Sequence, residues 1–148
     1  MFSNLIQNPF ASPPPSISVD KQARFEDVQS FVRSASSSSS SSCHLINTLP
    51  LSNQDYLIKH TLEGHMEERL MNDILKNNDQ KHVRIIVYGT NNFDESAIKK
   101  RHAMERLGFE NVMVYSGGLF EWSLLQDIFG MEEFPTSRVE KNILLYKP

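Results

Sequence analysis

Runs of consecutive hydrophobic residues alternate along the chain with segments in which hydrophobic residues recur every three or four positions. The runs predict buried strands, and the spaced segments predict amphipathic helices. The expected strands are 17–19, 44–49, 56–62, 83–88 and 111–115. The expected helices follow caps at Asp20 and Asn92, and run from Met66 to Lys76 and from Leu119 to Phe129. This alternation predicts an α/β fold: a central, mainly parallel sheet of about five strands, flanked by helices on both faces.

The segment from 83 to 108 carries the clearest local signals. Val83–Tyr88 is nearly continuous in β-branched and aliphatic residues, which is typical of a parallel strand buried on both faces. Asn92, with Glu95 three positions later, predicts the cap of the following helix. Gly108 predicts the end of that helix. Its apolar stripe is expected at Phe93, Ala97, Met104 and Leu107.

The 148 residues predict a single domain, 17–148, with two segments outside its core. Residues 1–16 contain four prolines and predict a disordered lead-in. The serine tract at 34–42 offers almost nothing to bury and predicts a loop insertion exposed to solvent. Phosphorylation of this tract is an alternative reason for its presence. Leu144–Tyr146 is either an edge strand or a docked tail.

Charge and composition exclude several classes of function. The net charge of −3 argues against nucleic acid and anionic membranes as partners. No apolar run approaches the roughly 20 residues of a membrane-spanning helix. The single cysteine, Cys43, and the lack of Lys or Arg before Lys21 favour a cytoplasmic protein over a secreted one. The basic run Lys99–Arg101, with Arg106, is expected on the solvent side of its helix.

Three segments in order resemble the catalytic half of the rhodanese (sulfurtransferase) family. They are the strand ending Ile-Ile-Val-Tyr-Gly at Gly89, the Leu-Gly-Phe-Glu-Asn-Val segment at 107–112, and the Gly-Gly-Leu-Phe-Glu-Trp turn at 117–122. The resemblance covers 17–130 in element order and is specific over 83–122. Gly117 and Gly118 would let the strand turn tightly into a helix, so that Trp122 packs against the core near the loop.

The resemblance implies a catalytic loop directly after the strand at 83–88. In the family a cysteine there carries the transferred sulfur, whereas this loop has no cysteine and no Lys or Arg between 89 and 98. The loop consists of Gly89, Thr90, Asn91, Asn92, Phe93, Asp94 and Glu95. Asp94 and Glu95 are expected to cap the next helix and to oppose binding of an anion. The sequence therefore predicts a catalytically inactive domain that binds or regulates a protein partner, without a cofactor.

Two other functions stay open at this stage. One is a sulfurtransferase or a relative of the cysteine phosphatases with a displaced nucleophile, for which Cys43 is the candidate. Thr90 is a poor substitute because a hydroxyl needs an adjacent base and the loop contains no histidine. The other is a scaffold regulated through its serine tract. Metal binding is not expected, because His60 and His65 are five positions apart, a spacing that suits neither a helix nor a strand. The family's Asp and Arg at the second strand are replaced by Asn47 and Leu49.

Overall fold

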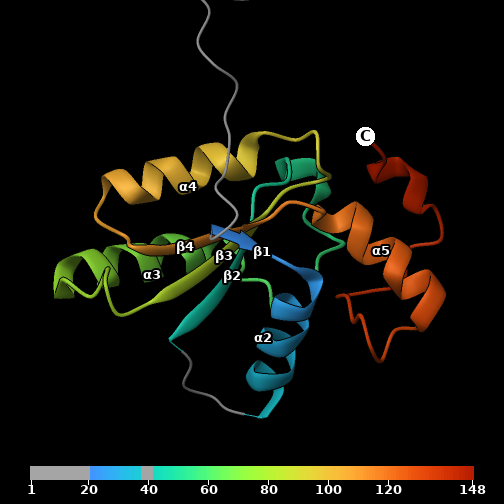
Figure 1. The fold of residues 1–148 in the computed structure, drawn as a ribbon, viewed down its shortest axis with the longest axis horizontal. Coiled ribbons are helices and arrows are strands. Elements are labelled where there is room, and N and C mark those ends of the chain that lie inside the picture. Colours follow the sequence, from blue (N-terminus) through green and yellow to red (C-terminus); the bar gives the residue numbers. More distant parts are fainter. Residues whose placement is uncertain (1–20, 38–41) are drawn as a thin grey trace, which may run out of the picture.

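The computed structural model describes residues 21–37 and 42–148. Within these residues a parallel sheet of four strands has the order β1-β4-β3-β2 (Figure 1). The strands are β1 (Gln22–Ala23), β2 (Cys43–Asn47), β3 (Arg84–Tyr88) and β4 (Asn111–Tyr115). The helices are α2 (Phe25–Ser37), α3 (Gly64–Asn77), α4 (Ser96–Arg106) and α5 (Gly118–Phe129), with short 3₁₀ helices η2 (Leu51–Asn53) and η3 (Ile143–Tyr146). The predicted α/β class and parallel sheet are confirmed, with four strands described rather than about five.

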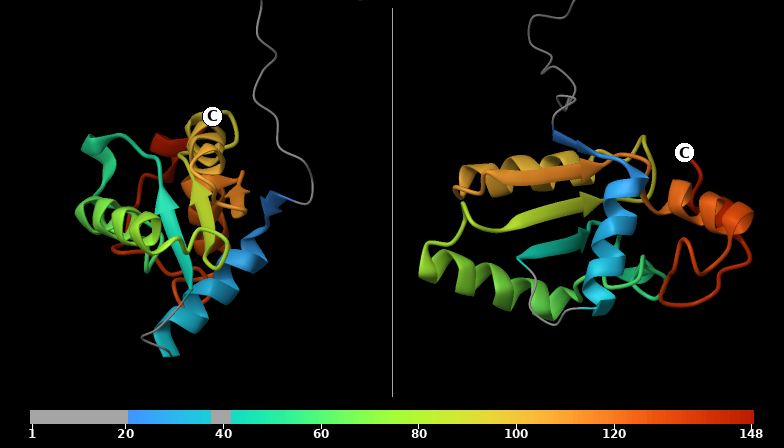
Figure 2. Two further views of the ribbon diagram at one scale, coloured as in Figure 1. Left: turned by 90° about the vertical axis from the view of Figure 1, so that its left-hand side faces the viewer. Right: turned by 60° about the horizontal axis from the view of Figure 1, so that its bottom comes forward.

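Strand β3 lies at the centre of the fold because both of its faces are apolar. Ile85 and Val87 pack into the core beneath α3 and α4, where Ile74 and Met104 are buried. Ile86 and Tyr88 face the opposite core, which contains buried residues of α2 and α5. Figure 2 shows these two pairs of helices on the two sides of the sheet. The prediction of helices on both faces is therefore confirmed.

The start of the described chain differs from the prediction. Gln22–Ala23 is a strand, and α2 begins only at Phe25, where the Arg24 N–H donates to the Asp27 carboxylate over 2.8 Å. The expected helix start at Asp20, the expected strand at 17–19 and the lead-in 1–16 lie outside the described residues. The apolar face of α2 is buried at Val28, Phe31 and Val32, which recur at helical spacing.

The serine tract is helical in its first part, contrary to the expected loop. Helix α2 continues to Ser37, and the Ser36 hydroxyl donates to the Val32 carbonyl oxygen over 3.0 Å. Ser37 makes the same contact with the Arg33 carbonyl oxygen over 3.3 Å. Through these bonds the serine hydroxyls find acceptors within the helix itself. Residues 38–41 lie outside the described part.

The predicted strand at 56–62 is wrong. Tyr56, Leu57 and Ile58 are buried, but the chain then turns at His60, which has a left-handed φ of 67°. In place of a ladder, the segment forms two isolated bridges, Ile58 with Thr136 and Thr61 with Leu45, and the Ile58 N–H donates to the Tyr88 hydroxyl over 3.2 Å. The hydrophobic run reflects burial of individual side chains in the core rather than an extended ladder.

Helix α4 also differs from its predicted pattern. Ala97 and Met104 are buried as expected, and Gly108 ends the helix with a φ of 97°. Leu107, expected on the apolar stripe, is instead exposed. Arg101, expected in solvent, is 6% exposed and pairs with Glu105 over 2.8 Å. A buried helix face can include a long cation when a carboxylate one turn away offsets its charge.

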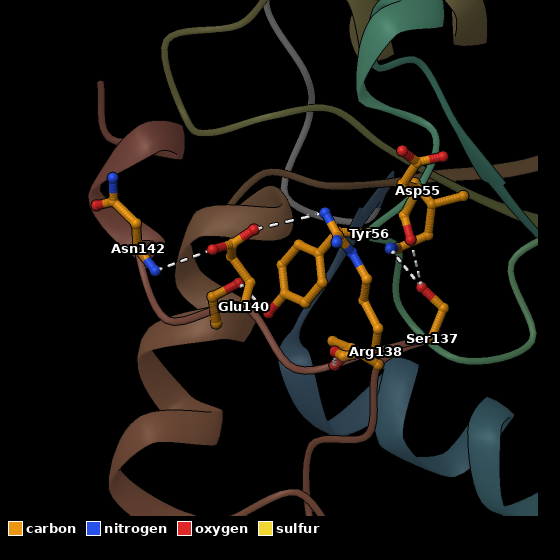
Figure 3. A network of polar contacts seen from close by, with 9 residues as sticks. Asp55, Tyr56, Ser137, Arg138, Glu140 and Asn142 are labelled. Atoms are coloured by element: carbon orange, nitrogen blue, oxygen red, sulfur yellow. Dashed lines mark hydrogen bonds and ion pairs between the residues drawn. The ribbon is translucent and has the colours of Figure 1, made fainter.

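The C-terminal segment is a docked tail rather than an edge strand. Tyr146 of η3 is buried and stacks on Tyr56 with ring centroids 5.6 Å apart. Figure 3 shows the tail residues before η3 next to the Tyr56 segment. The Ser137 hydroxyl donates to the Asp55 carbonyl oxygen over 3.1 Å, and Glu140 accepts from the Asn142 N–H over 3.0 Å. Of the helices in the described residues, none is both long and apolar enough to cross a bilayer.

Candidate functional site: a loop with an internal carboxylate

The loop 89–95 leaves the carboxyl end of β3 and leads into α4, and the start of α5 lies directly against it. The Leu119 N–H donates to the Gly89 carbonyl oxygen over 3.0 Å, and the Phe120 N–H donates to the Thr90 carbonyl oxygen over 2.9 Å. On its other side, the Asn91 side-chain amide donates to the Tyr146 carbonyl oxygen over 2.9 Å. These contacts fix the loop between two helices and the tail.

The Gly-Gly turn permits this close approach. Gly118 has a φ of 66°, and a Cβ there would lie 2.6 Å from the Gly89 carbonyl oxygen and 3.0 Å from the Asn91 nitrogen. Any larger residue would therefore clash with rigid backbone. At Gly117 the Glu121 side chain covers the place of a Cβ. The backbone therefore requires glycine at Gly118, whereas Gly117 has a helical φ of −61°.

The Asp94 carboxylate occupies the centre of the loop. Its Oδ2 accepts a hydrogen bond from the Thr90 N–H over 2.9 Å, and its Oδ1 accepts one from the Ser96 N–H over 2.9 Å. Burial works to raise the pKa of this carboxyl, but the hydrogen bonds from Thr90 and Ser96 outweigh it, so the pKa of Asp94 lies below its ordinary value. Two N–H groups that could receive an external anion, those of Thr90 and Ser96, are therefore bonded to an internal one.

The same carboxylate lies where a side chain at position 89 would project. A Cβ built on Gly89 would lie 2.6 Å from Asp94 Oδ2 and 3.2 Å from the Thr48 hydroxyl. Next to them is a cavity of about 40 Å³, lined in part by Gly89 and Asp94. This space suits about one water molecule, whereas pockets for small molecules usually measure about 300–1,000 Å³.

Comparison with known proteins identifies the family. A model of the rhodanese-like domain matches residues 18–125. This chain belongs to the rhodanese-like family. The crystal structure of the Alr3790 protein from Anabaena sp. is similar in fold: 18% sequence identity, a TM-score of 0.50, 84% of this chain and 98% of that chain covered. No curated protein matches the chain significantly.

Other residues of the rhodanese-like loop have structural roles. The expected pairing of Asn92 with Glu95 as the cap of α4 is wrong, because Asp94 bonds the first helical N–H and Glu95 contacts Lys99 over 3.8 Å. Phe93, expected on the apolar stripe of α4, is 76% exposed. Asn92 lines the small cavity. Four polar residues in five positions offered several caps, and only the fold selects one.

Two hydroxyls that the sequence did not single out also meet the loop. The hydroxyls of Thr48 and Ser96 lie 2.6 Å apart, and Thr48 donates to the Tyr88 carbonyl oxygen over 3.3 Å. Thr48 directly follows β2, and the ends of parallel neighbours β2 and β3 meet at one edge of the sheet. Its position at the carboxyl end of the predicted strand 44–49 was the signal that could have found it.

Asn47 and Trp122, two positions through which the sequence was compared with the family, have defined contacts. Asn47 is buried, and its side-chain oxygen accepts a hydrogen bond from the Leu49 N–H over 3.1 Å. A neutral side chain that bonds its own turn therefore replaces the family's acidic residue. Trp122 is fully buried, and its indole N–H donates to the Pro135 carbonyl oxygen over 3.1 Å. Its ring meets Tyr115 edge-on at 6.3 Å, which confirms the expected packing against the core.

Cys43 is far from the loop in the topology of the sheet. It begins β2 and pairs with Arg84, whereas the loop leaves the opposite end of β3, where Asn47 pairs with Tyr88. Burial raises the pKa of the Cys43 thiol, and the charge of Arg84 and an N–H bond only partly offset this. A half-buried thiol of raised pKa is a weak nucleophile at neutral pH.

The histidines weighed as metal ligands have other contacts. The His60 ring lies 3.0 Å from the Ser36 hydroxyl, and His65 lies 3.6 Å from Glu63. Throughout 21–37 and 42–148, no three His, Cys, Asp or Glu side chains are grouped so that they could hold a metal ion.

Proposed function

We propose that this rhodanese-like domain does not transfer sulfur and acts as a binding or regulatory module. The observation that carries the proposal is the Asp94 carboxylate, hydrogen-bonded to the loop amides and 2.6 Å from the place of a Cβ on Gly89. Sulfur transfer from thiosulfate requires a thiolate nucleophile and a loop that stabilises negative charge. Gly89 supplies no thiol, and the carboxylate repels a second anion.

The charges around the loop support the same conclusion. The first cation after Gly89 in the sequence is Lys99, and its ammonium lies 3.8 Å from the Glu95 carboxylate. No Lys or Arg of the loop itself therefore offsets the charge of an incoming thiosulfate or phosphate. The cavity of about 40 Å³ leaves no room for either beside Asp94.

The rival function is sulfur transfer through Cys43. Intact-mass spectrometry after incubation with thiosulfate, and separately with polysulfide, distinguishes the two. We expect no persulfide from thiosulfate, and the polysulfide sample serves to show that a persulfide on Cys43 would be detected. A persulfide that forms from thiosulfate, is discharged by cyanide and disappears in Cys43→Ala would overturn the proposal.

A further inference from the structure

A cleft of about 660 Å³ lies between α2 and residues 131–137, the segment that follows α5. The two walls are neighbours in the fold (Figure 1). The lining includes Arg33 and Ser36 of α2, and Lys59 from the turn that precedes α3. The cleft is far larger than the cavity of about 40 Å³ beside Asp94. It therefore has room for a charged group that does not fit in the loop after β3.

The Ser36 hydroxyl lies next to a histidine. Its oxygen donates to the Val32 carbonyl oxygen and lies 3.0 Å from Nε2 of His60. Because Val32 takes the hydroxyl hydrogen, the ring nitrogen is the donor in the contact with His60. The neighbouring Ser37 hydroxyl instead contacts carbonyl oxygens of its own helix over 3.3 and 3.1 Å. A group added to the oxygen of Ser36 therefore enters the surroundings of His60.

Two more bases lie around this oxygen. Lys59 precedes His60 and lines the same cleft, and within the described residues it has no ion pair. Arg33 lies three positions before Ser36 on α2, so the two side chains are neighbours on the surface of the helix. A dianionic group such as a phosphate accepts charge-assisted hydrogen bonds from each of these three bases.

The cleft also contains acids, which limit how strongly a phosphate is held. Glu132 and Glu133 lie on the opposite wall, and Glu133 pairs with Arg33 over 3.0 Å. The side chains of this pair are 65% and 54% exposed, so the pair is weak and a dianion on the same helix competes for Arg33. The carboxyl end of α2 opposes negative charge as well. A phosphate on this wall therefore depends first on His60 and Lys59.

The sequence before Ser36 matches the charge pattern that one class of protein kinases selects. Ser36 is the only serine or threonine of the chain with a Lys or Arg three positions earlier. Basophilic kinases choose their substrates by such a base. Ser36 also belongs to the last turn of α2, which ends at Ser37. Because helix ends fray, this serine can adopt the extended form that a kinase binds.

We infer that Ser36 is phosphorylated by a basophilic protein kinase, and that His60, Lys59 and Arg33 hold the phosphate in the cleft. In this reaction the Ser36 oxygen bonds to the γ-phosphorus of ATP while the bond from that phosphorus to the bridging oxygen breaks. ADP leaves, and the hydroxyl proton passes to the catalytic aspartate of the kinase. The inference adds a regulatory modification to the domain and does not depend on the absence of sulfur transfer.

The first test is phosphorylation of the full chain by calmodulin-dependent protein kinase II, which selects Arg three positions before a serine. Peptide mass spectrometry should place the phosphate on Ser36. Ser36→Ala should abolish the reaction, and Arg33→Ala should slow it at least about tenfold. No incorporation, phosphate spread evenly over the serines, or an unchanged rate in Arg33→Ala would overturn the inference.

The second test measures whether the cleft holds the phosphate. Two full chains, Ser36→phosphoserine and the matched control Ser37→phosphoserine, are made by incorporation during translation. The second pKa of a phosphoserine is about 6, and nearby cations lower it because they favour the dianion. In phosphorus NMR the phosphate on residue 36 should therefore titrate at least about half a pH unit below the one on residue 37. Equal midpoints would overturn the inference.

His60 provides the reciprocal measurement. In the unmodified chain, burial and then the charge of Lys59 hold the pKa of His60 below its ordinary value. A phosphate beside the ring favours its charged form, so Ser36→phosphoserine should raise the titration midpoint of His60 by about one pH unit. Ser37→phosphoserine should raise it by less than half as much. The same midpoint in both chains would contradict the inference.

Variants of the bases locate the contacts. Added to Ser36→phosphoserine, the pair Lys59→Ala and His60→Asn should return the phosphate midpoint to that of the residue 37 control. Asn suits position 60 because the φ there is 67°, in the left-handed region. Lys81→Ala, which removes a lysine paired with Glu110, should leave the midpoint unchanged. A midpoint that does not respond to loss of Lys59 and His60 would overturn the inference. None of these measurements involves the loop 89–95, so their failure leaves the proposed absence of sulfur transfer to its own test.

Discussion

The place of the Asp94 carboxylate predicts strong energetic coupling between positions 89 and 94. A Cβ on Gly89 would lie 2.6 Å from Asp94 Oδ2, which is inside van der Waals contact. The φ of Gly89 is not in the left-handed region, so the backbone itself accepts a side chain. Gly89→Cys must therefore push the Asp94 carboxylate away from the Thr90 N–H, from which it accepts a hydrogen bond.

The structure sets the size of this effect. A hydrogen bond to a charged group contributes about 1.5–3 kcal/mol, and the lower half applies because Asp94 is partly exposed. We expect Gly89→Cys to lower the free energy of unfolding by about 2 kcal/mol, through the lost Thr90 bond. Asp94→Ala loses the bonds from both Thr90 and Ser96 and should cost about 2.5 kcal/mol. With the carboxylate absent, adding Gly89→Cys costs little, so the coupling should be about 1.5–2 kcal/mol.

The assay is urea denaturation at pH 7, followed by fluorescence of the single tryptophan, Trp122, in a Cys43→Ala background. Gly64→Cys is the control, because a Cβ at Gly64 meets no heavy atom within 4 Å. In the double-mutant cycle of Gly64→Cys with Asp94→Ala, the two changes in the free energy of unfolding should add within about 0.5 kcal/mol. Equal additivity in the Gly89 cycle would refute the reasoning.

The introduced thiol provides a second measurement of the same contact. In Gly89→Cys the neighbouring Asp94 carboxylate should raise the pKa of the thiol above the ordinary value. In the double variant with Asp94→Ala, the Thr90 and Ser96 N–H groups face the thiol and should lower its pKa. Alkylation rate against pH measures both, and identical profiles would show that the carboxylate does not control the loop.

Three further predictions concern single groups. Gly118→Ala should lower the free energy of unfolding by about 2–4 kcal/mol, because position 118 has a positive φ and an added Cβ clashes with the Gly89 carbonyl oxygen. The control Gly64→Ala should change it by less than about 0.5 kcal/mol. Equal urea midpoints for the two variants would contradict this. The lowered pKa of Asp94 stabilises the fold above the unfolded pKa of about 3.9, and this contribution is lost as pH falls through the folded value; the stability gap between wild type and Asp94→Asn should therefore shrink below about pH 4 and not above it. Because burial raises the pKa of Cys43, the folded protein should react with a disulfide reagent at pH 7.5 at least about tenfold more slowly than the urea-unfolded chain, and equal rates would show an accessible thiol.

The elements around the site were predictable where the local sequence allows one structure. Ile85–Val87 can only be buried on both sides, so β3 and the loop after it were placed correctly. Gly108 and Gly130 follow the ends of α4 and α5 with φ of 97° and 100°. Glycine adopts such left-handed backbone conformations more easily than other residues, so it marks the ends of helices. The segment 56–62 misled because burial, rather than pairing, makes its residues apolar.

The decisive contact of the site was not predictable. Asp94 was expected to cap α4, and it does bond the Ser96 N–H. Its second oxygen, however, reaches the Thr90 N–H and the place of a Cβ on Gly89, which depends on how the loop closes. The closure is set by Gly118 from the next βα turn, so it depends on tertiary packing rather than on the loop sequence.

The most direct test of the account is the formation of thiocyanate from thiosulfate and cyanide by the purified protein. We predict no thiocyanate above that of a heat-inactivated sample, because the loop supplies Gly89 and the Asp94 carboxylate in place of a thiolate and an open anion site. Turnover that rises with protein concentration and is abolished by Cys43→Ala would contradict the account.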